Sequence, residues 1–175
     1  AGCHIGFTGG NHDFWMGEFL ERELGCSVSS GWLELEVQGK KLCMAHGDGL
    51  IRGDTGYKVL KKILRSRLNI ALYKLVHPDV GIPFAKACSR LGRQASNEEM
   101  KRIVERLFQE VALLKFREGF DIVVVGHVHL PYEKTQDGKA LFVVGDWIEN
   151  VTYLVMEDGT MTRKMWKDAA GERQS

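Results

Sequence analysis

The sequence predicts an α/β fold built as one domain. Short apolar runs that end in Gly-containing polar turns indicate strands, and longer segments with apolar residues every three or four positions indicate helices. The 175 residues are 44% hydrophobic and 27% charged. A chain of this size and composition can bury one sizeable core, and it lacks the polarity of a disordered protein. We therefore expect residues 1–175 to form a single domain.

The first elements are a strand, a turn and a helix, followed by a hairpin. Residues 3–8 form a short strand that enters a Gly-rich turn at 9–13, and residues 14–24 have helical spacing that stops at the next glycine. Residues 32–37 and 41–45 then alternate well enough to pair as a β-hairpin. In both units a strand runs into a polar turn.

Residues 55–93 form a basic helical block, which we expect to be a lid-like insertion within the domain. Its apolar residues recur with helical spacing from Tyr57 onward, until Pro78 and Pro83 interrupt the pattern. Between Arg52 and Arg93 there are ten basic and two acidic residues, a net charge of +8, whereas the whole chain carries only +1. The balance of the whole chain gives no reason to expect a nucleic-acid partner.

The second half of the chain alternates in the same way. A capping box at 96–99 starts a helix whose apolar stripe continues to about Leu114 and which stops at Gly119. Residues 122–125 are a continuous apolar run, typical of a strand buried on both faces. Further strands are predicted at 141–144, 152–156 and 161–167, which gives a strand-rich tail.

The cysteines and the hydropathy indicate a cytoplasmic protein. The cysteines are widely spaced, without a C-x-x-C pair, and no signal peptide is recognisable, so we expect reduced thiols that pack in the core. No apolar run approaches the about 18 residues of a membrane span. The chain opens with Ala and its first strand begins almost at once, which leads us to expect further sequence upstream.

Four candidate metal ligands lie in polar turns directly after predicted strands, namely Asn11, His46, His127 and His129. Strand ends gather along one edge of a layered α/β fold, and ligands bind there. A mixture of imidazole and amide ligands suits Mn²⁺, Fe²⁺ or Zn²⁺, with Mn²⁺ or Fe²⁺ preferred here. Two such ions, roughly 3.5–4 Å apart, support in-line attack on phosphorus. The sequence thus predicts two divalent ions and phosphoester chemistry.

Each motif also has a structural interpretation. Asp13 in the G-N-H-D turn could simply cap the following helix, and His46 beside a glycine is typical of a surface turn. His127 and His129 are harder to explain in that way, because two imidazoles after a buried strand are costly to leave unpartnered. His77 is better explained as a helix-end residue. The three motifs together, in this order, favour the metal site.

At this point the sequence resembles the calcineurin-like metallophosphoesterases. The matching segments are Gly10–Asp13, His46–Asp48 and Gly126–His129, which agree with the later motifs of that superfamily in order and context. The resemblance implies a four-layer α/β/β/α sandwich, here lacking its N-terminal part and carrying the helical insertion. It also implies that the chain is a hydrolase.

Carried over residue by residue, the resemblance implies roles for five side chains. Asn11, His46 and His127 would bind one metal ion, and His129 would bind the other. His12 would contact the scissile phosphate or protonate the leaving group, which makes it the candidate catalytic residue.

Within the superfamily, the chain looks most like the bacterial UDP-2,3-diacylglucosamine pyrophosphatases of lipid A biosynthesis. The features that suggest this branch are Phe14 after the G-N-H-D turn, Asp54 and Tyr57 at the spacing of substrate contacts, the insertion at 55–93, and Val144–Trp147 before the last strands. The residues that the resemblance assigns to the substrate are Asn11, His12, Asp54, Tyr57 and His127.

The implied reaction is hydrolysis of the pyrophosphate bond of UDP-2,3-diacylglucosamine to lipid X and UMP. A block that is both basic and apolar suits a substrate with phosphates and acyl chains, and it suits the anionic inner face of the cytoplasmic membrane. We therefore expect a peripheral membrane enzyme. The alternative is a helix pair whose apolar stripes cover the sandwich and whose polar face is solvated.

Two departures from this branch leave other functions open. His12 stands where the lipid A enzymes often carry Arg, which favours a phosphodiesterase or phosphatase for a soluble nucleotide or phosphodiester. The Asp-x-His and Gly-Asp-x-x-Asp motifs that normally precede G-N-H-D are absent before Asn11. We accordingly predict that the chain as given binds Mn²⁺ weakly and is poorly active, and a non-catalytic scaffold is the third possibility.

Overall fold

The computed structural model describes residues 2–10, 13, 18–51, 62, 66–73, 75–91 and 97–166, and its architecture is mixed α/β as predicted. Its helices are α1 (Phe19–Leu24), α3 (Arg67–Tyr73), α4 (Pro78–Leu91), α5 (Asn97–Leu107), the π-helical turn η1 (Phe108–Ala112) and α6 (Leu113–Arg117). Its strands are β1 (Gly6–Thr8), β2 (Ser27–Ser29), β3 (Leu33–Val37), β4 (Lys40–Ala45), β5 (Ile122–Val125), β6 (Tyr132–Gln136), β7 (Lys139–Val143), β8 (Thr152–Glu157) and β9 (Thr160–Met165).

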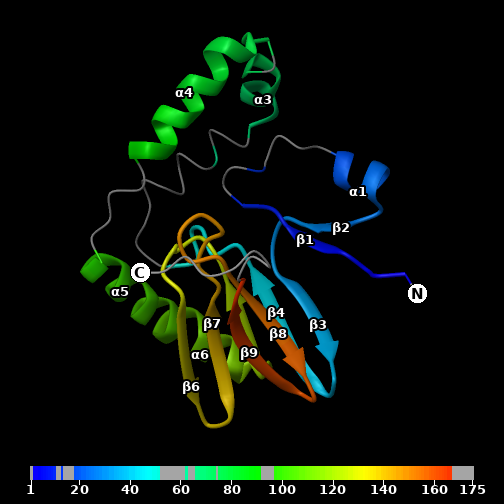
Figure 1. Cartoon of the computed structure of the whole chain (residues 1–175), viewed down its shortest axis with the longest axis vertical. Coiled ribbons are helices and arrows are strands. Elements are labelled where there is room, and N and C mark those ends of the chain that lie inside the picture. Colours follow the sequence, from blue (N-terminus) through cyan, green and yellow to red (C-terminus); the bar gives the residue numbers. More distant parts are fainter. Residues whose placement is uncertain are drawn as a thin grey trace.

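A five-stranded sheet in the order β3-β4-β5-β7-β6 forms the centre of the molecule (Figure 1). The inner strands β4, β5 and β7 are mutually parallel, and the edge strands β3 and β6 pair antiparallel with their neighbours. The carboxyl ends of the three inner strands therefore lie at the same edge of the sheet. This is the arrangement expected to bring loop residues from distant parts of the sequence together.

The two faces of the sheet are buried by different partners. On one face, alternate strand residues such as Cys43, Val123 and Leu141 pack against the continuous helix α5-η1-α6 through Leu107 and Phe108. The opposite face packs against the β8-β9 hairpin, through Leu42, Ile122, Val124 and Phe142 of the sheet and Leu154, Met156 and Met161 of the hairpin. β5 is buried along its whole length, as its continuous apolar run predicts. A helix, a sheet and a β-hairpin thus form successive layers, and the four-layer sandwich stays a prediction.

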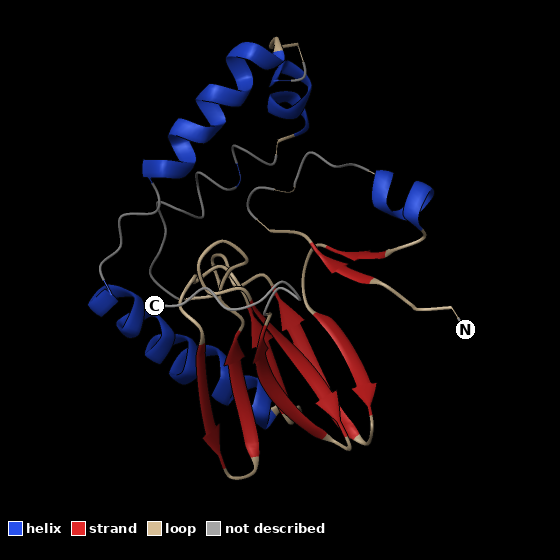
Figure 2. Ribbon diagram, in the orientation of Figure 1, coloured by secondary structure: helices blue, strands red, loops and turns tan. Residues whose placement is uncertain are grey.

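The N-terminal unit is a separate small sheet, in which β1 pairs in parallel with β2 (Figure 2). Helix α1 ends at Gly25, which adopts the left-handed conformation at φ 64°, as the glycine stop predicts. The hairpin of β3 and β4 is also confirmed. β6 was not predicted, because its sequence YEKTQ is polar. It lies at the edge of the sheet, where a strand can form without apolar residues on both of its faces.

The basic helical block contains α3 and α4, which are drawn apart from the central sheet (Figure 1). Pro78 begins α4, but Pro83 lies inside it, so the second proline does not end the helix as predicted. The Tyr73 hydroxyl donates to the Gly81 carbonyl at 2.7 Å and ties the two helices together. Several apolar side chains in the described part of this block are solvent-exposed, namely Leu68 (67%), Leu72 (53%), Leu75 (82%), Val80 (65%), Ile82 (53%) and Phe84 (63%).

A stripe that covers the sandwich would be buried, so the exposure of Leu68, Leu72 and Leu75 argues against a covering role for the described stripe of the block. In the described part of the chain, no helix has the length and apolar character needed to cross a membrane.

Candidate functional site

Polar residues follow all three parallel strands at the carboxyl edge of the sheet. His46 follows β4, Gly126 and His127 follow β5, and Asp146 lies three residues beyond β7. The first two loops are in contact, because a Cβ built on Gly47 would lie 3.2 Å from the Gly126 carbonyl oxygen. The parallel topology therefore gathers segments that are about 80 residues apart in sequence.

His46 and His127 meet at this edge. Their ring centroids are 5.2 Å apart and the rings are inclined at 66°, in an edge-to-face contact. His127 has a left-handed backbone at φ 63°, and both residues are only partly exposed. Among the predicted ligands that lie within the described residues, His46 and His127 have side chains in contact.

The G-N-H-D turn reaches the same place through Gly10. Gly10 is buried, and a Cβ on it would lie 2.6 Å from Cε1 of His46 and within 2.9 Å of both ring nitrogens. The Asp13 carboxylate accepts a hydrogen bond from the Gly10 backbone N–H at 2.8 Å, and the Asp13 N–H donates to the Gly10 carbonyl at 3.2 Å. Gly10 and Asp13 are thus hydrogen-bonded to each other, and Gly10 lies against the His46 ring.

Four predicted site residues lie outside the described residues, namely Asn11, His12, Asp54 and Tyr57. Their assignments as ligand, catalytic residue or substrate contacts stay predictions.

The loop after β7 forms a hydrogen-bonded cluster beside His129. One oxygen of Asp146 accepts the backbone N–H groups of Ile148 (2.8 Å), Glu149 (2.6 Å) and Asn150 (3.3 Å). The other lies 3.8 Å from Nδ1 of His129 and accepts a hydrogen bond from the Asn150 side chain at 2.9 Å. Although burial raises the pKa of Asp146, the hydrogen bonds from Glu149, Ile148 and Asn150 outweigh it and lower the pKa to about 2.

Sequence reasoning did not place Asp146 or Asn150 at the site. Val144–Trp147 resembles the family only as a segment, and a Gly-Asp pair after a strand is ordinary turn chemistry. The signal that could have identified Asp146 is its position after a third strand that ends at the same edge as the first two.

The imidazole groups at this edge are ligands of the type that a borderline divalent ion prefers. Two of them, on His46 and His127, are in contact with each other. Imidazole suits Mn²⁺, Fe²⁺ or Zn²⁺, and His46 and His127 already face each other beneath the buried Gly10. Within the described segments, no three His, Cys, Asp or Glu side chains are grouped so that they could hold a metal ion. His129, 53% exposed at its side chain, is held toward Asp146. The two-metal ligand set therefore stays a prediction.

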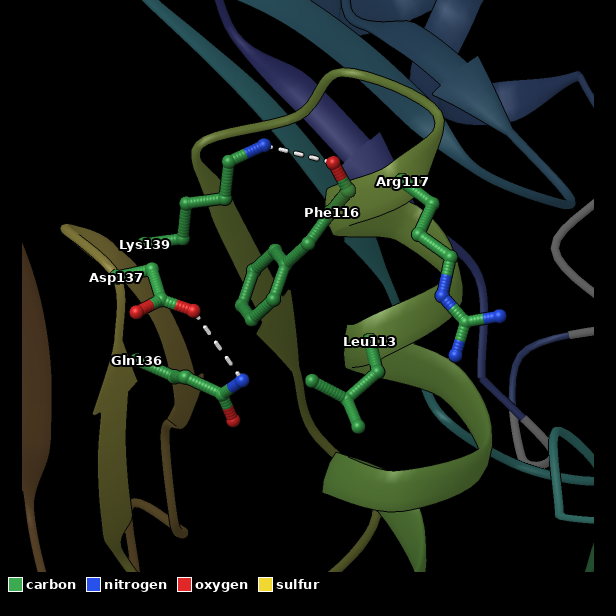
Figure 3. A pocket seen from close by; sticks show the side chains of 6 residues that line it. All are labelled: Leu113, Phe116, Arg117, Gln136, Asp137 and Lys139. Atoms are coloured by element: carbon green, nitrogen blue, oxygen red, sulfur yellow. Dashed lines mark hydrogen bonds between the residues drawn. The ribbon is translucent and has the colours of Figure 1, made fainter.

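A hollow of about 290 Å³ lies at the other end of the sheet (Figure 3). It is lined by Leu113, Phe116, Arg117, Gln136, Asp137 and Lys139. The lysine donates to the Phe116 carbonyl at 2.6 Å and so joins the end of α6 to the start of β7. Because β7 runs away from this hollow toward the histidine loops, the hollow is separate from the candidate site.

Comparison with known proteins supplies independent information. No protein-family model matches the chain. The UDP-2,3-diacylglucosamine hydrolase of Porphyromonas gingivalis is 28% identical over 95% of this chain and 70% of its own length. Two proteins of the same name are each 26% identical to this chain. The match to the Haemophilus influenzae protein covers 90% of this chain and 66% of that protein. The match to the Pseudomonas putida protein covers 84% of this chain and 63% of that protein. The chain thus spans about two thirds of the length of these relatives.

Among solved structures, the solution NMR structure of a Thermotoga maritima protein matches this chain at 14% identity and a TM-score of 0.38. The match covers 91% of this chain and 62% of the Thermotoga maritima chain. A similarity of that size does not identify a fold. The sequence relatives are more informative, and they agree with the branch that Phe14, Asp54, Tyr57, the insertion and Val144–Trp147 suggest. Over most of its length, this chain is similar to curated bacterial hydrolases named for UDP-2,3-diacylglucosamine.

Proposed function

We propose that the chain carries the larger part of a metal-dependent hydrolase that cleaves the pyrophosphate bond of UDP-2,3-diacylglucosamine to lipid X and UMP. The observation that carries the proposal is the convergence of three motif segments, since Gly10 of the first segment, His46 and His127 meet at one edge of the sheet. The names and the coverage of the relatives support the choice of substrate.

In this proposal the residues of the chain bind and orient the reacting groups. His46 and His127 would hold one divalent ion together with Asn11, and His129 would contribute to a second. The ions would supply Lewis-acid stabilisation of charge that develops on the phosphate oxygens. His12, which follows Asn11 in the sequence, would contact the scissile phosphate or donate a proton to the leaving oxygen. Asp54 and Tyr57 would bind the substrate at the start of the helical block.

The helical block would face the acyl chains and the membrane surface. Leu68 and Leu72 lie four residues apart on one face of α3, and their side chains are 67% and 53% exposed. Exposed apolar side chains within a stretch of net charge +8 favour binding to an anionic lipid surface over exposure to water. The proposed enzyme would thus work as a peripheral protein at the inner face of the cytoplasmic membrane.

The membrane proposal is tested with vesicles of phosphatidylglycerol and of phosphatidylcholine. Transfer of a leucine side chain into lipid is worth about 1.5–3 kcal/mol, so Leu68→Asp/Leu72→Asp should weaken partition onto anionic vesicles at least about tenfold. The matched control is Phe19→Asp/Leu24→Asp on α1, where both side chains are equally exposed at 59% and 58%. Equal binding of both double variants, or no preference for the anionic vesicles, would contradict the proposal.

The catalytic proposal is tested on the complete protein with Mn²⁺. UDP-2,3-diacylglucosamine should be cleaved to UMP, and bis-p-nitrophenyl phosphate much more slowly; the reverse order would favour the soluble phosphodiesterase, and no turnover of either would favour a scaffold. His127→Ala should lower turnover by at least about 100-fold, since loss of a supporting residue alone costs about 10–100-fold. His77→Ala is the control, because that side chain is 73% exposed at the start of α4. Unchanged turnover in His127→Ala would exclude the metal assignment.

A further inference from the structure

The loop after β7 makes three separate contacts with the segment that carries His129. The Asn150 side chain donates to the His129 backbone carbonyl at 2.8 Å. The Asp146 oxygen that accepts from the Asn150 side chain faces Nδ1 of the His129 ring at 3.8 Å. Gly145 lies against Pro131, since a Cβ on the glycine would come within 2.7 Å of the Pro131 ring. The backbone and side chain of His129, and the proline two residues later, are each in contact with the same loop.

The loop itself is rigidly built. One oxygen of Asp146 is used by three backbone N–H groups, which fixes the carboxylate and leaves its second oxygen turned toward His129. Asn150 bridges that second oxygen and the His129 carbonyl with a single amide group. The Thr152 hydroxyl donates to the Val144 carbonyl and closes the loop at its base. The Asp146 side chain is only 11% exposed, whereas that of His129 is 53% exposed.

We propose that Asp146, with Asn150, is a positioning residue that fixes the ring orientation and the tautomer of His129. A carboxylate facing Nδ1 favours the tautomer with the proton on Nδ1, which leaves the lone pair on Nε2 directed away from the loop. Histidines that bind metals commonly donate their other ring N–H to a carboxylate in this way. At 3.8 Å, the distance between Nδ1 of His129 and the Asp146 oxygen is too long for a hydrogen bond, and the interaction is electrostatic. If this distance shortened by about 1 Å, the two groups would form a charge-assisted hydrogen bond.

This inference rests on the proposed function for its purpose, but its first test needs neither metal nor substrate. In the metal-free chain with ¹⁵N-labelled histidine, long-range ¹H–¹⁵N spectra at about pH 8, above the ordinary histidine pKa of about 6.5, report the tautomer of each ring. His129 should be protonated at Nδ1. Asp146→Asn keeps an oxygen for the backbone N–H groups, yet its amide cannot accept from Nδ1–H, so His129 should shift toward the Nε2–H form.

The second readout is Mn²⁺ binding, followed by paramagnetic broadening of the same ring signals. In Asp146→Asn, the Mn²⁺ concentration needed to broaden the His129 signal should rise by about 10–100-fold. The His46 and His127 signals should broaden at the same Mn²⁺ concentrations as in the unmodified chain. Asn150→Ala should act in the same direction, and Asp137→Asn, in the exposed β6-β7 turn, is the control that changes nothing.

The outcomes separate the two hypotheses. If His129 is already an Nε2–H tautomer in the unmodified chain, or keeps Nδ1–H in Asp146→Asn with Mn²⁺ broadening unchanged, the positioning role is wrong. If the tautomer behaves as expected but the complete protein does not cleave UDP-2,3-diacylglucosamine, the positioning role stands and the proposed function fails. Loss of all three histidine signals together in Asp146→Asn would mean that the loop only maintains the fold, which also overturns the proposal.

Discussion

Replacement of Gly10 by Ala tests the contact on which the candidate site is built. The added methyl would lie 2.6 Å from Cε1, 2.8 Å from Nδ1 and 2.9 Å from Nε2 of His46. Ordinary contacts between heavy atoms begin near 3.5 Å, so the ring must move by about 1 Å. It cannot move freely, because the edge of the ring packs against His127. Gly10 does not have a left-handed backbone, so backbone strain does not contribute.

The expected effect has two parts. Overpacking of this kind costs about 1–3 kcal/mol in the free energy of unfolding. A displacement of about 1 Å in a catalytic group lowers turnover by about 100-fold. Denaturant unfolding of the chain measures the first, and turnover of UDP-2,3-diacylglucosamine by the complete protein measures the second. The ¹H–¹³C ring signals of His46 and His127 should shift together in the variant.

The adjacent glycine is a matched control. Gly9→Ala adds the same methyl group one residue earlier, where nothing lies within 4 Å, so stability, ring signals and turnover should all stay near those of the unmodified protein. If Gly10→Ala behaved like Gly9→Ala in all three measurements, the G-N-H-D turn would not rest on His46, and the convergence argument would lose one of its three segments.

Two further predictions concern stability and thiol chemistry. Gly145→Ala should destabilise the chain by about 2–4 kcal/mol in denaturant unfolding, because φ is +87° and the new Cβ would overlap Pro131; Gly138→Ala, at φ +75° with open space around it, should cost only about 1–2 kcal/mol. Burial raises the pKa of Cys43 to about 12, so iodoacetamide at neutral pH should modify exposed Cys3 and reach Cys43 only after denaturation, which peptide mass spectrometry would show. Rapid native labelling of Cys43 would contradict its burial.

Local patterns in the sequence were sufficient for most individual elements. The continuous apolar run of β5 reflects burial on both faces, and the glycine after α1 provides the left-handed residue that ends the helix. The capping box and stripe predicted the long helix, although not the π-helical turn at Phe108–Ala112, since one extra residue in a helical turn has no distinct signature in the side-chain pattern. These features depend on interactions within a few residues of each other.

The site was predictable only where residue type and strand position coincided. Histidines directly after strands are unusual enough to be noticed, and the contact between His46 and His127 follows once β4 and β5 are parallel neighbours. Asp146 and Asn150 carry no such signal, because their importance lies in tertiary hydrogen bonds with a segment about 20 residues away. Strand β6 was missed for a related reason, since the polarity of an edge strand resembles that of a loop.

The way in which the parallel strands leave the sheet explains why the polar groups collect at one edge. Beyond β4, β5 and β7, the chain turns through left-handed residues at Gly47 (φ 108°), His127 (φ 63°) and Gly145 (φ 87°). Glycine adopts this conformation without penalty, whereas a residue with a Cβ pays about 1–2 kcal/mol. Of these three left-handed positions, His127 is the one occupied by a residue with a side chain, so its backbone is the strained one. Strain of this kind persists where surrounding contacts enforce it and is concentrated at functional sites. The same conformation also occurs away from the histidine pair, at Gln38, Asp137, Val151 and Asp158, so it supports the proposed role of His127 only together with the His46 contact.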